Sequence, residues 1–402
     1  MFHKLIKPLI GLCLLAVVYS VGSRVYLYHT HAQAPQVTIE GLKNEGYYKG
    51  TIEAKIAINN PYKIATIVAQ LDQKPFQGIP ANPGSRKISH TFSLNTEQLE
   101  YGEHTLHLLV TDASKNKNSG EFVVKFFVDN LPLSVTFLET NYRVDLGKTA
   151  HLKVKANKPL ATATIKVMNQ EYCCYADKPG SSSYECFIPI GCEETPSSHD
   201  IVAQITDHVG QTQKITANLE VVQFNFPKQK GFSVSAEKLA AEREISMKQD
   251  VLGEAITRWA KESPNQKLWQ GPFVLPMQAK RMTTPFGEIR VTPEKGRYLH
   301  KGLDLANMPR SIVWAAQHGK IIIKERFAMS GNTVVIDHGL GITTVYAHLD
   351  SFADIEVGQD IKKGSPLGKV GMTGYANGYH LHWELLVNGT AVDPLEWTDK
   401  VY

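Results

Sequence analysis

The sequence lacks the charge pattern of a nucleic-acid-binding protein and the composition of a disordered or fibrous one. Its 402 residues carry a formal net charge of only +4, and they contain no basic run. Nucleic-acid-binding domains usually show a basic patch or stripe, so no nucleic-acid partner is expected. Charged residues make up 20% and hydrophobic residues 43%, which is typical of globular domains. At roughly 100–200 residues per domain, the length predicts two to four domains.

Long hydrophobic runs are also scarce, and the clearest one lies at the N-terminus. Lys4 and Lys7 precede an apolar run over about residues 8–22. This pattern matches the basic start and apolar centre of a secretory signal peptide. The run is short for a membrane span, which needs about 20 residues. The sequence therefore predicts an exported chain of the periplasm or cell envelope, in which residues 1–34 are either a cleaved signal peptide or an uncleaved inner-membrane anchor.

Cysteine is scarce as well, with five in the chain, one of them in the N-terminal segment. The other four form a cluster: Cys173, Cys174, Cys186 and Cys192. An even set in an exported chain predicts disulfide bonds, because such compartments are oxidising. A zinc knuckle is the alternative, but two adjacent cysteines do not easily face one tetrahedral metal. The sequence does not determine the pairing.

The chain between the N-terminal segment and about residue 226 consists of short strand patterns. They are rich in β-branched and aromatic residues and are broken by turn signals, which is typical of β-sandwiches. The pair Thr111-Asp112 recurs as Thr206-Asp207. The first copy resembles the immunoglobulin-like domains of bacterial surface and envelope proteins. We therefore expect two immunoglobulin-like sandwiches, over residues 35–130 and 131–226, with the cysteine cluster in the second.

Residues 227–266 change character and predict a helical linker. The segment from Ala236 to Glu262 contains no proline, and one helical face is apolar, at Leu252, Ala255, Ile256 and Trp259. Such a helix would pack on the next domain, or it would shield an active site before activation. Residues 267–402 are rich in glycine and strand patterns, so an antiparallel β-fold is expected there. The predicted fold class is thus mainly β.

Three stretches of this last region carry candidate chemistry: His300–Asp304, Tyr346–Leu349 and His380–Glu384. In a strand, residues i and i+2 face the same side, so His380 and His382 project together. Two histidines and one carboxylate are a recurrent catalytic zinc set that leaves a position for water. Zinc can lower the pKa of that water to near 7. The spacing alone leaves open which histidine of the pair binds metal, and the sequence has no His-Glu-x-x-His helix.

From about Pro276 to Trp397 the chain strongly resembles the lysostaphin-like (LytM-type) peptidoglycan metallopeptidases. The shared pieces occur in order: Thr284–Gly287, His300–Asp304, Gly331–Gly339, Tyr346–Leu349, Thr373–Gly374 and His380–His382. The resemblance implies that His300, Asp304 and His382 bind one Zn²⁺ ion. It also implies that His348 and His380 are the catalytic histidines, and that the substrate is bacterial peptidoglycan.

Several neighbouring polar residues have more than one interpretation. Glu384 faces the same side as His382, where it would either orient a histidine or form a structural salt bridge. Asn332 would bond either to the backbone or to substrate. We expect structural roles for His338, near a strand start, and for His318, in a turn.

The sequence thus predicts a zinc metalloendopeptidase that cuts peptide cross-links of the cell wall. Family members cut glycyl bonds or D-alanyl cross-links, and the predicted disulfides and anchor favour the D-alanyl type. The sandwiches are expected to hold the enzyme on wall polymer or on a protein partner in the envelope. The alternative is a non-enzymatic protein that activates a cell-wall amidase or scaffolds the wall machinery.

Overall fold

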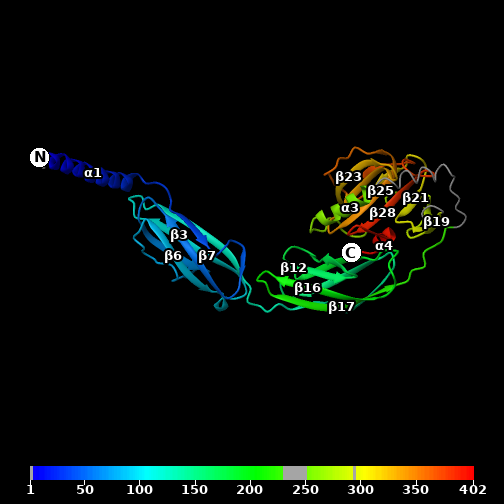
Figure 1. Ribbon diagram of the computed structural model, residues 1–402, viewed down its shortest axis with the longest axis horizontal. Helices are drawn as coiled ribbons and strands as arrows, with labels where there is room; N and C mark the ends of the chain where they lie inside the picture. Colours follow the sequence, from blue (N-terminus) through cyan, green and yellow to red (C-terminus); the bar gives the residue numbers. More distant parts are fainter. Residues whose placement is uncertain (1–2, 230–250, 293–295) are drawn as a thin grey trace. The chain divides into compact units, whose positions relative to one another are not determined.

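The structure is a computed structural model that describes residues 3–229, 251–292 and 296–402 (Figure 1). It is mainly β with mostly antiparallel sheets, as the sequence predicts. The chain forms two compact units. One comprises Met1–Pro132 with His208–Gln211, and the other comprises Leu133–Asp207 with Thr212–Tyr402.

The first unit contains the helix α1 (His3–Thr30) and two β-sheets. The smaller sheet has the order β1 (Gln36–Glu40), β3 (Thr51–Asn59), β6 (Lys87–Asn95). The larger has the order β2 (Gly46–Tyr48), β8 (Ser119–Val128), β7 (Gly102–Asp112), β4 (Ile64–Leu71), β5 (Lys74–Pro75). Alternate residues of β3 are buried, from Ile52 to Ile58, because one face of each sheet lines a shared core. Among the described residues, no helix is both long enough and apolar enough to cross a membrane.

The second unit begins with another pair of sheets. One has the order β14 (Tyr175–Ala176), β15 (Ser183–Pro189), β11 (Thr149–Ala156), β9 (Val135–Phe137). The other has the order β10 (Asn141–Asp145), β17 (Thr212–Val222), β16 (Ser198–Asp207), β12 (Leu160–Val167), β13 (Gln170–Cys173). We call this part the second sandwich. The immunoglobulin-like identity of the two sheet pairs stays a prediction.

The disulfide prediction is not supported by the structure. Cys173, Cys174, Cys186 and Cys192 are all free thiols. Neighbouring strand residues point to opposite sides, so Cys173 is exposed while Cys174 is buried beside Cys186. Complete burial raises the pKa of the Cys186 thiol, and the adjacent thiol of Cys174 raises that pKa further. Buried thiols of this kind remain protonated and behave as small core residues.

The C-terminal region is built on one large sheet. Its main order is β18 (Arg281–Thr284), β21 (Leu303–Ala306), β28 (His380–Val387), β25 (Ile342–Phe352), β24 (Gly331–Asp337), β23 (Gly319–Phe327), β26 (Asp360–Ile361). Shorter elements border it: β22 (Ile312–Trp314), β27 (Pro366–Val370), β29 (Thr390–Val392), the hairpin of β19 (Ile289–Thr292) and β20 (Gly296–Leu299), and the helix α4 (Pro394–Asp399). The predicted hairpin turn at Asn388-Gly389 is confirmed, since both residues have positive φ between β28 and β29.

The helical linker is present as α3 (Val251–Glu262), and the rest of the predicted helix lies outside the described residues. Its predicted apolar face is confirmed: Ile256 is buried, and Leu252, Ala255 and Trp259 pack beside it on the sheet. The helix therefore covers one face of the large sheet, over Val335, Val345 and Leu386.

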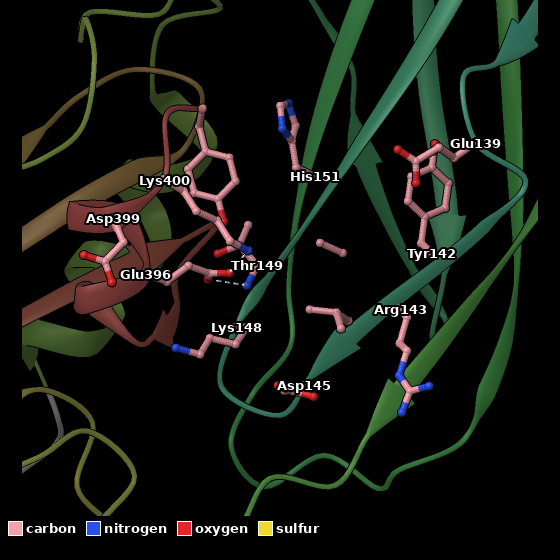
Figure 2. Close-up of a pocket in the computed structure, with 13 residues that line it drawn as sticks. Glu139, Tyr142, Arg143, Asp145, Lys148, Thr149, His151, Glu396, Asp399 and Lys400 are labelled. Carbon is pink, nitrogen blue, oxygen red and sulfur yellow. Dashed lines mark hydrogen bonds and ion pairs between the residues drawn. The ribbon is translucent and has the colours of Figure 1, made fainter.

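The second sandwich and the C-terminal sheet share a core. The ring of Phe187, from β15, is buried among the aromatic residues of the C-terminal region. Lys148 forms an ion pair of 2.7 Å with Asp393. The Thr149 amide donates to the Glu396 carboxylate at 2.8 Å, beside a cavity of about 610 Å³. Figure 2 shows this contact. These contacts join two regions that are distant in sequence into one unit.

His338 is fully buried in the large sheet, where the sequence predicts a structural role. Its Nδ1 donates to the His318 carbonyl at 2.6 Å, and its Nε2 lies 2.8 Å from the Thr344 hydroxyl. Burial lowers the pKa of His338 to about 4. The imidazole is therefore neutral in the folded protein at neutral pH.

This burial predicts acid sensitivity. Because the folded pKa lies below the unfolded value near 6.5, the unfolded chain binds the proton more readily, and stability falls as pH drops from about 6.5 towards 4. Between pH 7.5 and 5, linkage predicts a loss of roughly 2 kcal/mol from this residue. Urea unfolding measures the unfolding free energies of metal-free wild type and His338→Asn. The difference between the two proteins should shrink by that amount as the pH falls from 7.5 to 5. A difference that is constant over this range would contradict the prediction.

Candidate metal centre

Three side chains converge at one face of the large sheet. Asp304 of β21 is in register with His382 of β28, so both side chains point to the same face. His300 lies just before β21. Three atoms form a compact triangle: His300 Nε2 is 3.1 Å from Asp304 Oδ1 and from His382 Nδ1, and the latter two are 2.8 Å apart. In the described part of the chain, this is the one group of three or more side chains of metal-binding type.

The donor set fits a tetrahedral metal ion. Zinc binds histidine nitrogen and carboxylate oxygen at about 2.0–2.2 Å, which places tetrahedral ligands about 3.3 Å from one another. The observed separations are slightly shorter, so small outward movements would admit the ion. Gly302 allows the backbone after His300 to lie close to the strand that carries His382. A Cβ at Gly302 would lie 2.6 Å from the Trp383 carbonyl oxygen and 3.0 Å from Cε1 of His382.

Each histidine of this triangle is held on its far side. His300 Nδ1 donates to the Pro285 carbonyl at 3.2 Å, and His382 Nε2 donates to the Glu384 carboxylate at 2.7 Å. These bonds leave His300 Nε2 and His382 Nδ1 free to face a metal. Glu384 thus orients His382, which is one of the two roles its sequence position allows.

The carboxylates dominate the electrostatics of the triangle. Burial alone would lower the pKa of His382, but hydrogen bonds to Asp304 and Glu384 outweigh burial and raise that pKa to about 10. Burial likewise opposes ionisation of Asp304, yet hydrogen bonds from His300 and His382 hold the pKa of its carboxyl well below the usual range. The triangle is therefore a strongly cation-favouring position.

Two further histidines lie beside the triangle. The rings of His348 and His380 are 4.9 Å apart, and His380 Nε2 is 3.7 Å from Asp304 Oδ1. His348 Nδ1 donates to the Thr373 carbonyl and His380 Nδ1 to the Gly378 carbonyl, each at 2.8 Å. Because carbonyl oxygens only accept, each imidazole carries a proton on Nδ1. Each Nε2 is then the nitrogen that can accept or donate a further proton.

The backbone at His348 is strained in a way that aims its side chain. Ala347 is in register with His382 and lines the site, so a regular strand would point His348 to the opposite face. Instead, β25 has an extra residue opposite β24, and His348 adopts a φ of +60°. Strain of this kind is often found at functional sites.

The surroundings of His348 hold this conformation. The His348 amide donates to the Ser330 carbonyl at 2.8 Å. Asn332 Nδ2 donates to the carbonyls of Leu349 and Asp350 at 3.0 and 3.1 Å, so the backbone is its partner here. Burial, and then the charges of His382 and His380, lower the pKa of His348 to about 4.

The structure brings a further polar residue, Arg290, to the site. Arg290 of β19 donates through Nη2 to Thr284 Oγ1 at 2.8 Å, and the same nitrogen is 3.5 Å from Asp304 Oδ2. Its Nε is 3.4 Å from Glu288. Thr284 belongs to a piece of the family resemblance, but nothing in the sequence connects it to an arginine six residues later.

The three residues of the triangle and the two further histidines line one groove of about 660 Å³. Its walls also include Arg281, Tyr298, Met329, Tyr375 and Tyr379. Leu252 of α3 contributes to the same wall. Shielding of the site by the linker helix stays a prediction.

Comparison with known proteins identifies the region around this groove. Residues 298–394 match Peptidase family M23. A DD-carboxypeptidase/endopeptidase Mpg of Neisseria meningitidis is 38% identical over 121 residues, which are 30% of this chain and 27% of that protein. A peptidoglycan DD-endopeptidase ShyB of Vibrio cholerae is 34% identical over 118 residues, which are 29% of this chain and 28% of that protein. The matches thus span little more than a quarter of these relatives.

The chain is also similar to parts of solved structures. A crystal structure of a peptidase M23 from Pseudomonas aeruginosa is 22% identical, with a TM-score of 0.42 over 66% of this chain and 92% of that one. The catalytic domain of lysostaphin from Staphylococcus simulans is 23% identical, with a TM-score of 0.27 over 36% of this chain and 98% of that one.

Proposed function

Because the C-terminal region is a domain of peptidase family M23, we propose that this protein is a zinc metalloendopeptidase that hydrolyses peptide cross-links of peptidoglycan. His300, Asp304 and His382 bind the zinc ion, and His348 and His380 are the catalytic histidines. The observation that carries this proposal is the triangle of three ligand atoms with two further imidazoles beside it, each presenting Nε2.

The residues divide the chemistry between them. When bound, zinc supplies a Lewis acid that polarises a carbonyl group and makes water more acidic. His348, neutral and protonated on Nδ1, accepts a proton from the attacking water through Nε2. The same Nε2 of His348 returns this proton to the leaving amine. His380, on the neighbouring strand β28, stabilises the oxyanion when its Nε2 also carries a proton. Asp304 acts as a metal ligand. Glu384 acts through His382, which it orients.

We infer the substrate and the location from the names of the relatives. Those named above are called a DD-carboxypeptidase/endopeptidase and a peptidoglycan DD-endopeptidase, which supports the D-alanyl cross-link as the bond cut by this chain. Such a substrate lies in the cell envelope, and we place the protein there. Because the matches span a minor part of each relative, the proposed activity is that of the C-terminal domain.

The test incubates the full-length protein with purified cross-linked peptidoglycan. We expect cross-linked muropeptide dimers to become monomers and new free amino groups to appear. A chelator should stop both changes, and added zinc should restore them. His382→Ala should contain no stoichiometric zinc, because two ligands of a solvent-open site hold zinc far less tightly than three.

The same experiment separates the enzyme from a non-enzymatic amidase activator. A folded, zinc-loaded protein that leaves the cross-links intact would rule out the endopeptidase. A protein that binds no zinc, and whose His382→Ala variant still stimulates an amidase, would establish the activator instead.

A further inference from the structure

The two oxygens of Asp304 face different partners. Oδ1 lies 3.1 Å from His300 Nε2 and 2.8 Å from His382 Nδ1, so it faces the metal position. Oδ2 lies 3.5 Å from Nη2 of Arg290, on the side of β18 and β19. The Asp304 side chain is 10% exposed and that of Arg290 is 19% exposed, so the pair is largely shielded from solvent. Screening by water is therefore limited at this contact.

We propose that Arg290 is a positioning residue that fixes the rotation of the Asp304 carboxylate, and so presents Oδ1 to the metal. This inference rests on the proposed function, because it assumes that Asp304 is a zinc ligand. Among the described residues, Arg290 forms no hydrogen bond or ion pair with His300 or His382, so its action passes through Asp304.

The arginine is itself held in place by two neighbours. Nη2 donates to the Thr284 hydroxyl at 2.8 Å, and Nε lies 3.4 Å from the Glu288 carboxylate. Thr284 is buried and is in register with Asp304 on the adjacent strand. The planar guanidinium presents several donors in fixed directions, so it can donate to Thr284 and Glu288 while it forms an ion pair with Asp304. This arrangement gives Thr284, in the Thr-Thr-Pro-Phe-Gly piece, a part in building the metal site.

If Arg290 acted only through its charge, its removal would change zinc affinity in the opposite direction from the loss of a positioning residue. A cation close to a bound divalent metal repels it, so removing a guanidinium that acted only through charge should leave zinc affinity unchanged or raise it. Removing a residue that orients a ligand should lower zinc affinity, and such losses are typically 10- to 100-fold. The direction of the change therefore distinguishes the two roles.

The experiment measures the zinc affinity of the full-length protein by competition with a chromogenic chelator. The variants are Arg290→Gln, Thr284→Val, the double variant and Arg281→Gln. Thr284→Val removes the hydroxyl that anchors Arg290 without changing any charge. Arg281→Gln is the matched control, since Arg281 lines the same groove and carries the same charge, but no ion pair with Asp304 is recorded for it among the described residues. Thermal melts of the metal-free proteins check that each variant folds.

We expect Arg290→Gln to weaken zinc binding 10- to 100-fold and Thr284→Val to weaken it several-fold. The double variant should bind no more weakly than Arg290→Gln, because both changes act through one contact. Arg281→Gln should stay within about twofold of wild type. Zinc binding by Arg290→Gln that equals or exceeds wild type would overturn the inference, as would an equal loss in Arg281→Gln. A wild type that binds no zinc would instead reject the proposed function.

Discussion

Replacing His348 with asparagine is expected to reduce the rate of cross-link cleavage by about 10²–10⁴-fold, the usual contribution of a general base. Asparagine tolerates positive φ better than most residues, so the backbone at φ +60° should be preserved while the imidazole is lost. Zinc content and melting temperature should stay close to those of wild type, because His348 does not belong to the ligand triangle. Steady-state cleavage of purified cross-linked muropeptides measures the effect.

His318→Ala is the matched control for this variant. His318 lies in the turn before β23, its side chain is exposed, and its ring bonds only to the neighbouring Gln317 among the described residues. Its removal should leave the cleavage rate within about twofold. A His348→Asn enzyme that kept a tenth or more of the wild-type rate would exclude His348 as the base. Loss of zinc from His348→Asn would instead point to a structural role in the metal site.

The geometry around His380 and His382 was predictable because it depends on local periodicity. The i, i+2 relation within one strand puts both histidines on one face whatever the rest of the chain does. The hairpin at Asn388-Gly389 was predictable for the same reason, since the turn residues themselves favour positive φ. The choice of His382 over His380 as ligand came from the family resemblance and not from spacing.

Other features depend on contacts between distant residues and could not be predicted. The position of His348 requires the bulge in β25, which arises from its pairing with β24. The contact of Arg290 with Asp304 requires the β19–β20 hairpin to fold beside β18 and β21. The disulfide expectation used only the number of cysteines and the compartment, and it is not supported, because all four cysteines are free thiols.

The second large effect concerns Phe187, whose backbone lies in the second sandwich while its ring lies in the peptidase core. The ring is 2% exposed and lies 5.9 Å from Trp269 and 5.7 Å from Trp397. Phe187→Ala should therefore cost about 3–5 kcal/mol of unfolding free energy, from lost burial and the cavity that remains. Because β15 also packs on β28, which carries His380 and His382, wall-cleaving activity should be lost at a lower temperature than in wild type.

Phe92→Ala provides the matched control, because Phe92 is 3% exposed in the core of the first unit. It should destabilise that unit by a similar amount and leave the inactivation temperature of cleavage unchanged. Scanning calorimetry, together with residual activity after heating, measures both variants. If Phe187→Ala lowered a melting transition while cleavage survived heating as in wild type, the second sandwich would be a separate folding unit. The expected result, with both losses together, makes the second sandwich a structural part of the peptidase.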